Sequence, residues 1–170
     1  MLVHLLKEEK SGLAMVFCNT RMNTDFVVKN LKANKIDAIA IHGGFTQNKR
    51  SRSLDFFNRA KFGVLVCTDV AARGLHIDNV SHVYNYEIPS DSKDYVHRIG
   101  RTARAGEAGK VINLLCEFDY DNFRRIQRDY SELSVEKMEK PHVERVIAIR
   151  VESSYGKKPF RSRKKTWRKR

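Results

Sequence analysis

Short apolar segments alternate with amphipathic segments along most of the chain, and this alternation limits the fold more than any other feature. The apolar segments have the length of buried strands, and the segments between them repeat apolar residues at helical spacing. We expect strands at residues 13–18, 38–41, 64–67, 82–85 and 111–116. We expect helices at residues 21–33, 47–58, 91–98 and 119–130. Strands that alternate with helices form a mainly parallel sheet with helices on both faces, so the pattern predicts an α/β fold.

Candidate capping residues support two of the helices. Asn23 and Thr24 lie near the start of the first, and Thr46 directly precedes the second. Their side-chain oxygens are suited to accept hydrogen bonds from the first turn of a helix. Beyond Ser131 the pattern weakens, and residues 132–140 and 144–153 fit an edge strand, a helix or a docked tail equally well.

The loops that follow the strands carry the unusual chemistry of this sequence. They read NTR, HGGFTQNKR, TDVAARGLHID and YEIPSDSKDYVHRIGRTARAG, and they are rich in Gly, Thr, Asn, Arg and His. An open parallel sheet binds its ligands at the carboxyl ends of its strands. We therefore expect the functional site in these loops.

Positive charge gathers at the C-terminus. The formal net charge is +13 over 170 residues, and residues 157–170 contain nine Lys or Arg and no acidic residue. Such a segment cannot bury itself, so we expect a disordered tail. Basic tails bind the phosphates of nucleic acids, and Phe160 and Trp167 are suited to stack on bases. The alternative is an extension that only increases solubility.

Several classes of protein are excluded by the same sequence. No apolar run approaches the roughly 18 residues of a membrane span, and Glu8 and Glu9 interrupt the place where a signal peptide needs an apolar core. We expect a cytoplasmic protein with no membrane partner. Cys18, Cys67 and Cys116 lack the spacing of metal ligands, so we predict buried thiols and no metal site.

One segment combines three arginines and a histidine within eight positions. Residues 97–104 read HRIGRTAR, and no acidic residue lies between Asp94 and Glu107 to neutralise them locally. If a turn begins near Gly100, Arg101 and Arg104 project on the same side and reach one multiply charged group. Guanidinium groups pair bidentately with phosphate oxygens and keep their charge, so the segment indicates phosphate binding.

These strings, taken together, resemble the motifs of the second domain of DEAD-box RNA helicases. VFCNTR resembles motif IV of that family, residues 47–50 its Q-x-x-R element, residues 68–78 its motif V and residues 97–104 its motif VI. The resemblance covers roughly residues 1–130. It implies a RecA-like three-layer αβα sandwich that forms one wall of an ATP cleft and half of an RNA groove.

The resemblance assigns residues to the nucleotide. Arg101 and Arg104 would act as arginine fingers on the γ-phosphate, and His97 would lie beside the attacking water, so these three are the catalytic residues. Gly74 and His76 would bind the nucleotide with the two arginines. His76 stands where relatives place Asp, which implies an altered contact with the ribose, and Ala103 replaces a glycine.

The resemblance also assigns the RNA and interdomain contacts. The residues implied at RNA phosphates are Thr20, Gly44, Arg50 and Thr68. The residues implied at the boundary with a second domain are Asp69, Arg73 and Gln47. No contact reads a base edge, so the implied RNA binding tolerates many sequences.

The phosphate cradle G-x-x-x-x-G-K-[ST] and an Asp-Glu-Ala-Asp string do not occur in these 170 residues. We therefore expect a helicase domain at 1–140, an extension of uncertain structure at 141–156 and the basic tail at 157–170. ATP with Mg²⁺ would be held mainly by an N-terminal RecA-like domain of the same protein, and this domain alone would be inactive. The alternative is a freestanding RNA-binding or regulatory module without ATPase activity.

Overall fold

The computed structural model describes residues 1–9, 11–59, 63–75, 77, 80–102 and 109–149. A five-stranded sheet lies at its centre, and all of its pairings are parallel. Across the sheet the strands are β2 (Ala38–Ile41), β3 (Val64–Cys67), β1 (Leu13–Phe17), β4 (Val80–Asn85) and β5 (Lys110–Asn113). Since every strand points the same way, all five carboxyl ends lie at one edge of the sheet.

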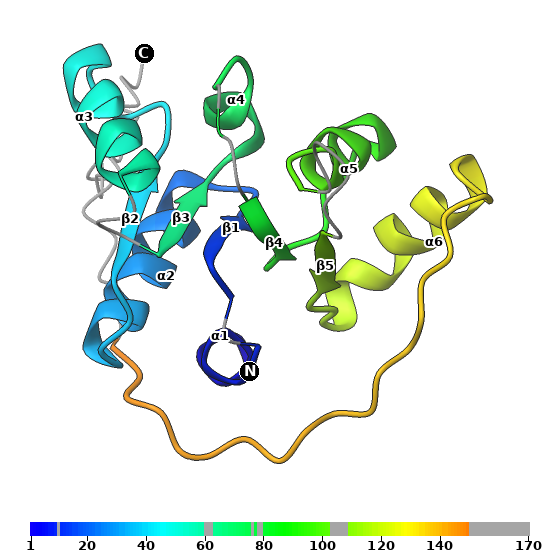
Figure 1. Cartoon of the computed structure of the whole chain (residues 1–170). Coiled ribbons are helices and arrows are strands. Elements are labelled where there is room, and N and C mark those ends of the chain that lie inside the picture. Colours follow the sequence, from blue (N-terminus) through cyan, green and yellow to red (C-terminus); the bar gives the residue numbers. More distant parts are fainter. Residues whose placement is uncertain (10, 60–62, 76, 78–79, 103–108, 150–170) are drawn as a thin grey trace, which may run out of the picture.

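Helices cover both faces of the sheet and give three layers (Figure 1). One face carries α3 (Gln47–Asn58), α4 (Asp69–Ala72) and α5 (Ser92–Ile99). The other carries α1 (Leu2–Glu8) and α2 (Arg21–Ala33). A short 3-10 turn, η1 (Glu117–Asp119), leads into α6 (Tyr120–Asp129), which flanks β5 and packs against α5. The predicted αβα sandwich is confirmed.

Alternate residues of the central strands supply two separate hydrophobic cores. On β1, Ala14 and Val16 face α1 and α2, while Met15 and Phe17 face α3 and α4. All four are at most 1% exposed. A strand covered on both faces must be apolar at every position, which is why LAMVF has no polar residue.

The helices and strands depart from the sequence predictions at several places. Helices 21–33 and 47–58 are confirmed, but Thr20 caps the first of them instead of Asn23 or Thr24. Strand β4 begins two residues earlier than predicted and β5 ends three residues earlier. Helices α1 and α4 were not predicted. Helix α1 has seven residues, whose apolar side chains face the sheet, and α4 is a single turn in the loop that follows β3.

The cysteine prediction is right for two residues and wrong for the third. Cys67 ends β3 and Cys18 directly follows β1, and both are fully buried. Burial raises the pKa of both thiols, that of Cys67 to about 12. Cys116 is exposed because β5 ends at Asn113, which leaves residues 114–116 outside the sheet.

Residues 131–149 form neither a helix nor a strand. They leave α6, run round the molecule and return to α2, where Ile147 and Ile149 are hydrogen bonded (Figure 1). Of the alternatives left open by the sequence, neither the edge strand nor the helix is present up to residue 149, and docking is shown for Ile147 and Ile149. The predicted basic tail at 157–170 lies outside the described residues. None of the described helices has the length and hydropathy needed to cross a membrane.

Candidate functional site

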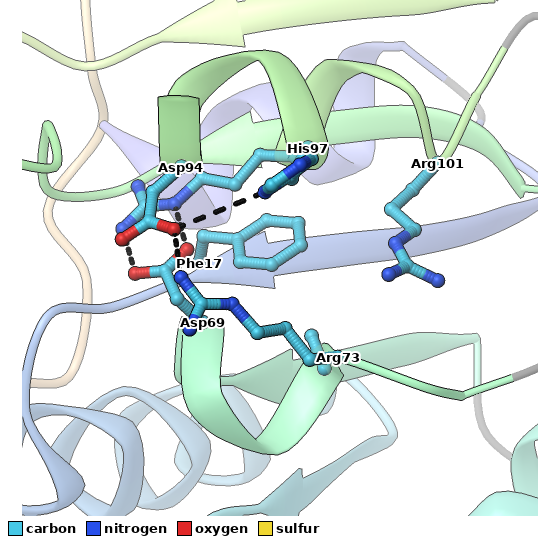
Figure 2. Close-up of a pocket in the computed structure, with 8 residues that line it drawn as sticks. Phe17, Asp69, Arg73, Asp94, His97 and Arg101 are labelled. Atoms are coloured by element: carbon cyan, nitrogen blue, oxygen red, sulfur yellow. Dashed lines mark hydrogen bonds and ion pairs between the residues drawn. The ribbon is translucent and has the colours of Figure 1, made fainter. Parts of the chain in front are cut away.

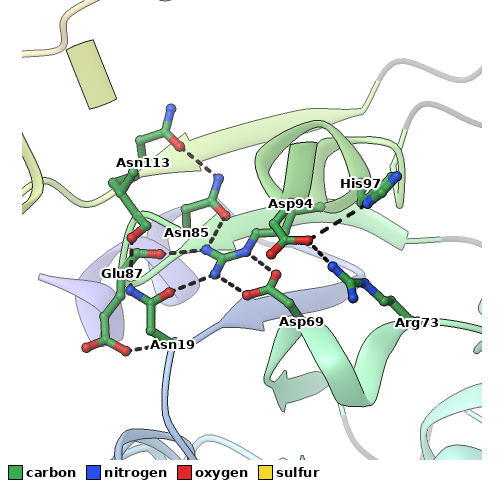
Figure 3. A network of polar contacts seen from close by, with 10 residues as sticks. Asn19, Asp69, Arg73, Asn85, Glu87, Asp94, His97 and Asn113 are labelled. Atoms are coloured by element: carbon green, nitrogen blue, oxygen red, sulfur yellow. Dashed lines mark hydrogen bonds and ion pairs between the residues drawn. The ribbon is translucent and has the colours of Figure 1, made fainter. Parts of the chain in front are cut away.

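A polar network at the carboxyl edge of the sheet includes Asn19, Asp69 and Asn85 (Figure 3). Arg98 is its centre, because it donates to all three of these side chains. Its side chain is 1% exposed, and all five of its N–H groups are used. Nε and Nη2 donate to the two carboxylate oxygens of Asp69 at 2.6 and 2.7 Å. The other three N–H groups donate to the Asn85 side chain at 3.1 Å, the Glu87 carbonyl at 2.6 Å and the Asn19 side chain at 2.9 Å.

The network joins segments that are far apart in the sequence. Asn19 follows β1, Asp69 follows β3, and Asn85 ends β4. Asn85 also donates to Asn113 on β5 at 2.8 Å. One guanidinium group therefore fixes the loops after three strands relative to each other. A buried arginine is stable here because it is paired with a carboxylate and fully hydrogen bonded.

The lack of a neighbouring acidic residue in segment 97–104 does not leave Arg98 without a carboxylate partner in the fold. Asp69 neutralises Arg98 across 29 positions of sequence. Local sequence could not show the pairing, because only the parallel sheet brings the loop after β3 beside α5. Arg98, Asn19 and Glu87 were not among the predicted site residues, although Asn19 and Glu87 both stand in loops that follow strands.

A second ion pair joins α4 and α5 at the surface. Arg73 donates to Asp94, which holds the pKa of the arginine above its usual value. His97 lies one turn after Asp94, with Nδ1 4.0 Å from a carboxylate oxygen of Asp94, and its side chain is 63% exposed. Both Asp69 and Asp94 are therefore already engaged by arginines, which leaves neither of them suited to bind a cation.

Arg101 lies just beyond the end of α5, apart from the Asp69–Asp94 cluster (Figure 2). It is half-buried, and Nη1 donates to the Leu75 carbonyl at 2.8 Å. Arg101, His97 and Arg73 line one hollow between α4 and α5, whose floor includes Phe17. The volume of this hollow is about 10 Å³, room for about one water molecule. Three arginines (Arg73, Arg98 and Arg101) and two carboxylates (Asp69 and Asp94) line it, so the hollow has an excess of one positive charge and is far too small to enclose a nucleotide.

Three of the four predicted RNA contacts lie in loops at the carboxyl edge, and the fourth, Arg50, lies on α3. Thr20 is exposed, and its hydroxyl accepts from the Asn23 N–H at 3.1 Å. Thr68 directly precedes α4 and is 8% exposed. Arg50 on α3 donates from Nη2 to the Ala71 carbonyl at 3.2 Å, and its Nε is buried without a hydrogen-bond partner among the described residues.

Gly44 stands in a loop that is held by a buried histidine. His42 is 4% exposed, and its Nδ1 accepts from the Gly44 N–H at 3.1 Å. Its Nε2 lies 3.1 Å from Asp25, so Nε2 carries the proton and donates to that carboxylate. The resemblance implied Gly44 at an RNA phosphate, but in this structure the Gly44 N–H is used inside the loop.

The remaining predicted residues fall in two groups. Gln47 is exposed at the start of α3, and Gly74 has a φ of 74°, a conformation that favours glycine, directly after Arg73. His76 and Arg104 lie outside the described residues, as does Ala103. The structure therefore brings together His97, Arg101, Arg73 and Asp69 around one hollow. It separates them from Gln47 and Gly44, which belong to the β2 side of the sheet.

Comparisons with known proteins agree on one family. A family model described as "Helicase conserved C-terminal domain" matches residues 1–106. The chain is 45% identical over 126 residues to the "ATP-dependent RNA helicase DDX47" of Drosophila melanogaster, covering 74% of this chain and 25% of that protein. It is 40% identical over 156 residues to the "ATP-dependent rRNA helicase RRP3" of Saccharomyces cerevisiae, covering 92% of this chain and 30% of that protein. The chain thus spans about a quarter to a third of the length of these relatives.

Solved structures show the same architecture. The E. coli DEAD-box protein SrmB, bound to regulator of ribonuclease activity A, superimposes with a TM-score of 0.72 at 36% identity, over 86% of this chain and 81% of that chain. Domain 2 of the DEAD-box helicase Mss116p, bound to an RNA duplex, superimposes with a TM-score of 0.70 at 33% identity, over 83% of this chain and 56% of that chain. With this fold and the motif residues around Arg98, the chain belongs to the helicase conserved C-terminal domain family, as found in DEAD-box RNA helicases.

Proposed function

We propose that this domain is the C-terminal wall of an ATP-dependent RNA helicase and works by closing on an N-terminal RecA-like domain of the same protein. The observation that carries the proposal is the cationic hollow between α4 and α5. His97 and Arg101 line it beside Arg73, while the N–H groups of Arg98 are all used in hydrogen bonds inside the domain. A cationic surface that is too shallow to hold a nucleotide is suited to meet one held by another domain. The relatives that share this domain are named ATP-dependent RNA helicases.

Arg101 would act on the transferred phosphate. Its guanidinium is anchored to the Leu75 carbonyl through Nη1, so the group is held in place at the mouth of the hollow. An arginine supplied from a second domain stabilises charge that develops on the phosphoryl group, and in GTPases such a residue contributes about 10³ to 10⁵ in turnover. Arg104 would supply a second guanidinium to the same phosphate. Gly74 and His76 would contact the nucleotide.

His97 would position groups at the same place. Asp94 lies 4.0 Å from its Nδ1 and pairs with Arg73, so the imidazole is held on α5 with an exposed edge. ATP supplies the phosphoanhydride bond whose hydrolysis drives the cycle, and Mg²⁺ neutralises its phosphates. Because Asp69 and Asp94 are both paired with arginines, the metal ion would be held mainly by the other domain.

RNA would bind along the carboxyl edge of the sheet through Thr20, Arg50 and Thr68. Gly44, whose N–H donates to His42, would contribute by letting the RNA backbone come close to a residue without a side chain. Arg50 is half-buried, and its bond from Nη2 to the Ala71 carbonyl ties the start of α3 to the loop after β3 at this edge. These contacts would go to phosphates, which fix position without reading sequence. Gln47, Asp69 and Arg73 would contribute to the boundary between the domains, Asp69 by fixing Arg98.

Reconstitution tests this function. The isolated domain should hydrolyse no ATP, and addition of the separately purified N-terminal domain should restore ATP hydrolysis that RNA stimulates. The matched control is the variant Arg124→Ala, which removes an exposed guanidinium from α6 and should leave the restored rate unchanged. RNA binding without any ATPase at saturating N-terminal domain would contradict the proposal and favour the freestanding RNA-binding module.

A further inference from the structure

The segment that returns to α2 is held there by two asparagine side chains, which we call the asparagine clip. The Asn30 amide donates to the Ile149 carbonyl at 3.0 Å, and its oxygen accepts from the Ile149 N–H at 2.8 Å. Asn34 forms the same pair of bonds with Ile147, at 2.8 and 3.0 Å. The four bonds all go to backbone groups, so the clip binds an extended main chain whatever its side chains.

The spacing of the clip matches an extended segment. Asn30 and Asn34 are four residues apart on a helix, which is a rise of about 6 Å. Ile147 and Ile149 are two residues apart, which in extended backbone is about 6.6 Å. Each asparagine therefore faces the same edge of the segment, and both can be satisfied together.

The asparagine side chains are also held in the orientation that the segment needs. The second amide hydrogen of Asn30 is donated to the Phe26 carbonyl at 2.9 Å, and that of Asn34 to the Asn30 carbonyl at 2.8 Å. Asparagine is a poor helix former because its side chain competes for backbone hydrogen bonds. Two asparagines one turn apart at the end of α2 lower its helix propensity, and the docked segment offsets that cost.

The direction of the docked segment is set by the same pairs. Residue numbers rise along the segment as they fall along α2, so the chain runs from the end of α2 towards its beginning. The beginning of α2 carries Thr20 and Arg21. Arg21 also adjoins the loop of Gly44, because a side-chain carbon at Gly43 would lie 3.0 Å from its guanidinium. The segment thus points to the edge where the proposed function places RNA.

We propose that the asparagine clip fixes the C-terminal segment on α2 so that the basic residues 157–170 are delivered to the RNA-binding edge, where they add to RNA affinity. This inference rests on the proposed function. Lys157 lies eight positions after Ile149, and eight positions of chain span at most about 26–29 Å. The rise of α2 from Asn30 back to Thr20 is only about 15 Å, so the basic residues reach that edge.

The clip shortens the tether of the basic residues. Before the clip, the last residue that packs against a core cluster is Leu133, which is 24 residues from Lys157. Opening the clip therefore lengthens the tether from 8 to 24 residues. The effective concentration of a tethered group falls roughly as the −3/2 power of tether length, which is about fivefold here.

The test is the double variant Asn30→Ala/Asn34→Ala in the full chain. Alanine is a better helix former than asparagine, so α2 is retained while the four bonds to the segment are lost. Hydrogen exchange of the Ile147 and Ile149 amides should accelerate by about tenfold or more. Exchange of the α2 amides should stay unchanged. The control Gln127→Ala removes an exposed side-chain amide from α6 and should change neither measurement.

RNA affinity is then measured with and without residues 157–170 in both backgrounds. In the parent chain, deletion of residues 157–170 should weaken RNA binding and flatten its salt dependence. In the double variant, the gain in RNA affinity from these residues should be about fivefold smaller than in the parent chain. Faster exchange with no loss of RNA affinity would overturn the delivery while the proposed function stands. Unchanged exchange would overturn the clip itself. A parent chain that binds no RNA would overturn both the delivery and the proposed function.

Discussion

Replacement of Arg98 by methionine should destabilise the domain strongly, because the guanidinium satisfies five acceptors at once. Arg98→Met keeps a long apolar stem but removes every N–H, which leaves the Asp69 carboxylate and three further oxygens without their donor. Removal of one partner of a buried ion pair costs about 3–5 kcal/mol. The Asp69 side chain is 17% exposed, so water reaches it in part. We therefore expect a loss of about 3–4 kcal/mol in the free energy of unfolding.

Lysine separates the role of charge from the role of geometry. Arg98→Lys keeps the positive charge but has three donors instead of five, so at least two acceptors lose their bond. We expect it to cost about 1.5–3 kcal/mol, less than methionine but clearly more than zero. Replacement of Asp69 by asparagine should then cost much less in the Arg98→Met background than in the parent chain, since the pair is already broken.

Urea denaturation followed by circular dichroism measures both variants. With an m-value of about 2 kcal/mol/M, a loss of 4 kcal/mol lowers the urea midpoint by about 2 M. The control Arg124→Met removes a guanidinium that is 78% exposed and should change the free energy of unfolding by less than about 0.5 kcal/mol. If Arg98→Met were no more destabilising than Arg124→Met, the five bonds would not hold the strand ends together and the reasoning would be refuted.

Two further predictions concern pH and thiol chemistry. Burial lowers the pKa of His82, whose neighbours are Glu9, Lys110, Ser81 and Tyr84. The His82 imidazole therefore takes up a proton at higher pH in the unfolded chain than in the folded domain. The free energy of unfolding should therefore fall as the pH drops below about 6.5, the usual pKa of histidine. In denaturation curves between pH 7.5 and 5.5, His82→Gln should reduce the slope of unfolding free energy against pH, and an unchanged slope would disprove the assignment. Iodoacetamide at pH 8 should label only Cys116 in the folded domain, slowly because its hydrogen bond to Asp119 raises its pKa, while Cys18 and Cys67 react only after unfolding. Mass spectrometry that found Cys67 labelled as fast as Cys116 would contradict the burial.

The layered fold could be predicted from the sequence because each of its signals is local. A fully apolar strand such as residues 64–67 and an amphipathic helix such as residues 47–58 show their period within a few residues. Helix α4 could not be predicted in this way. Its four residues are too few to show a period, and it lies in a loop whose composition favours turns.

The site could be predicted in its residue types but not in its pairings. The cluster at 97–104 contains both Arg98 and Arg101, yet the two arginines have different environments there. One is buried against Asp69, and the other lines a half-open hollow beside Leu75. This difference depends on the loop after β3, which is nearly thirty residues away. The asparagine clip was missed for the same reason, since Asn30 and Ile149 are 119 positions apart.

The most direct test of the account is the RNA-stimulated ATPase rate of the Arg101→Ala variant in the complete helicase that contains this domain. The hydrogen bond from Arg101 to Leu75 contributes about 0.5–1.5 kcal/mol, so the variant should stay folded, and its urea midpoint verifies this. We expect Arg101→Ala to lower the turnover about 10³-fold or more and to leave RNA affinity unchanged. The control Arg124→Ala should be fully active. A folded Arg101→Ala enzyme that kept its turnover within about tenfold of the parent would contradict the central claim, because that guanidinium would then take no part in the reaction.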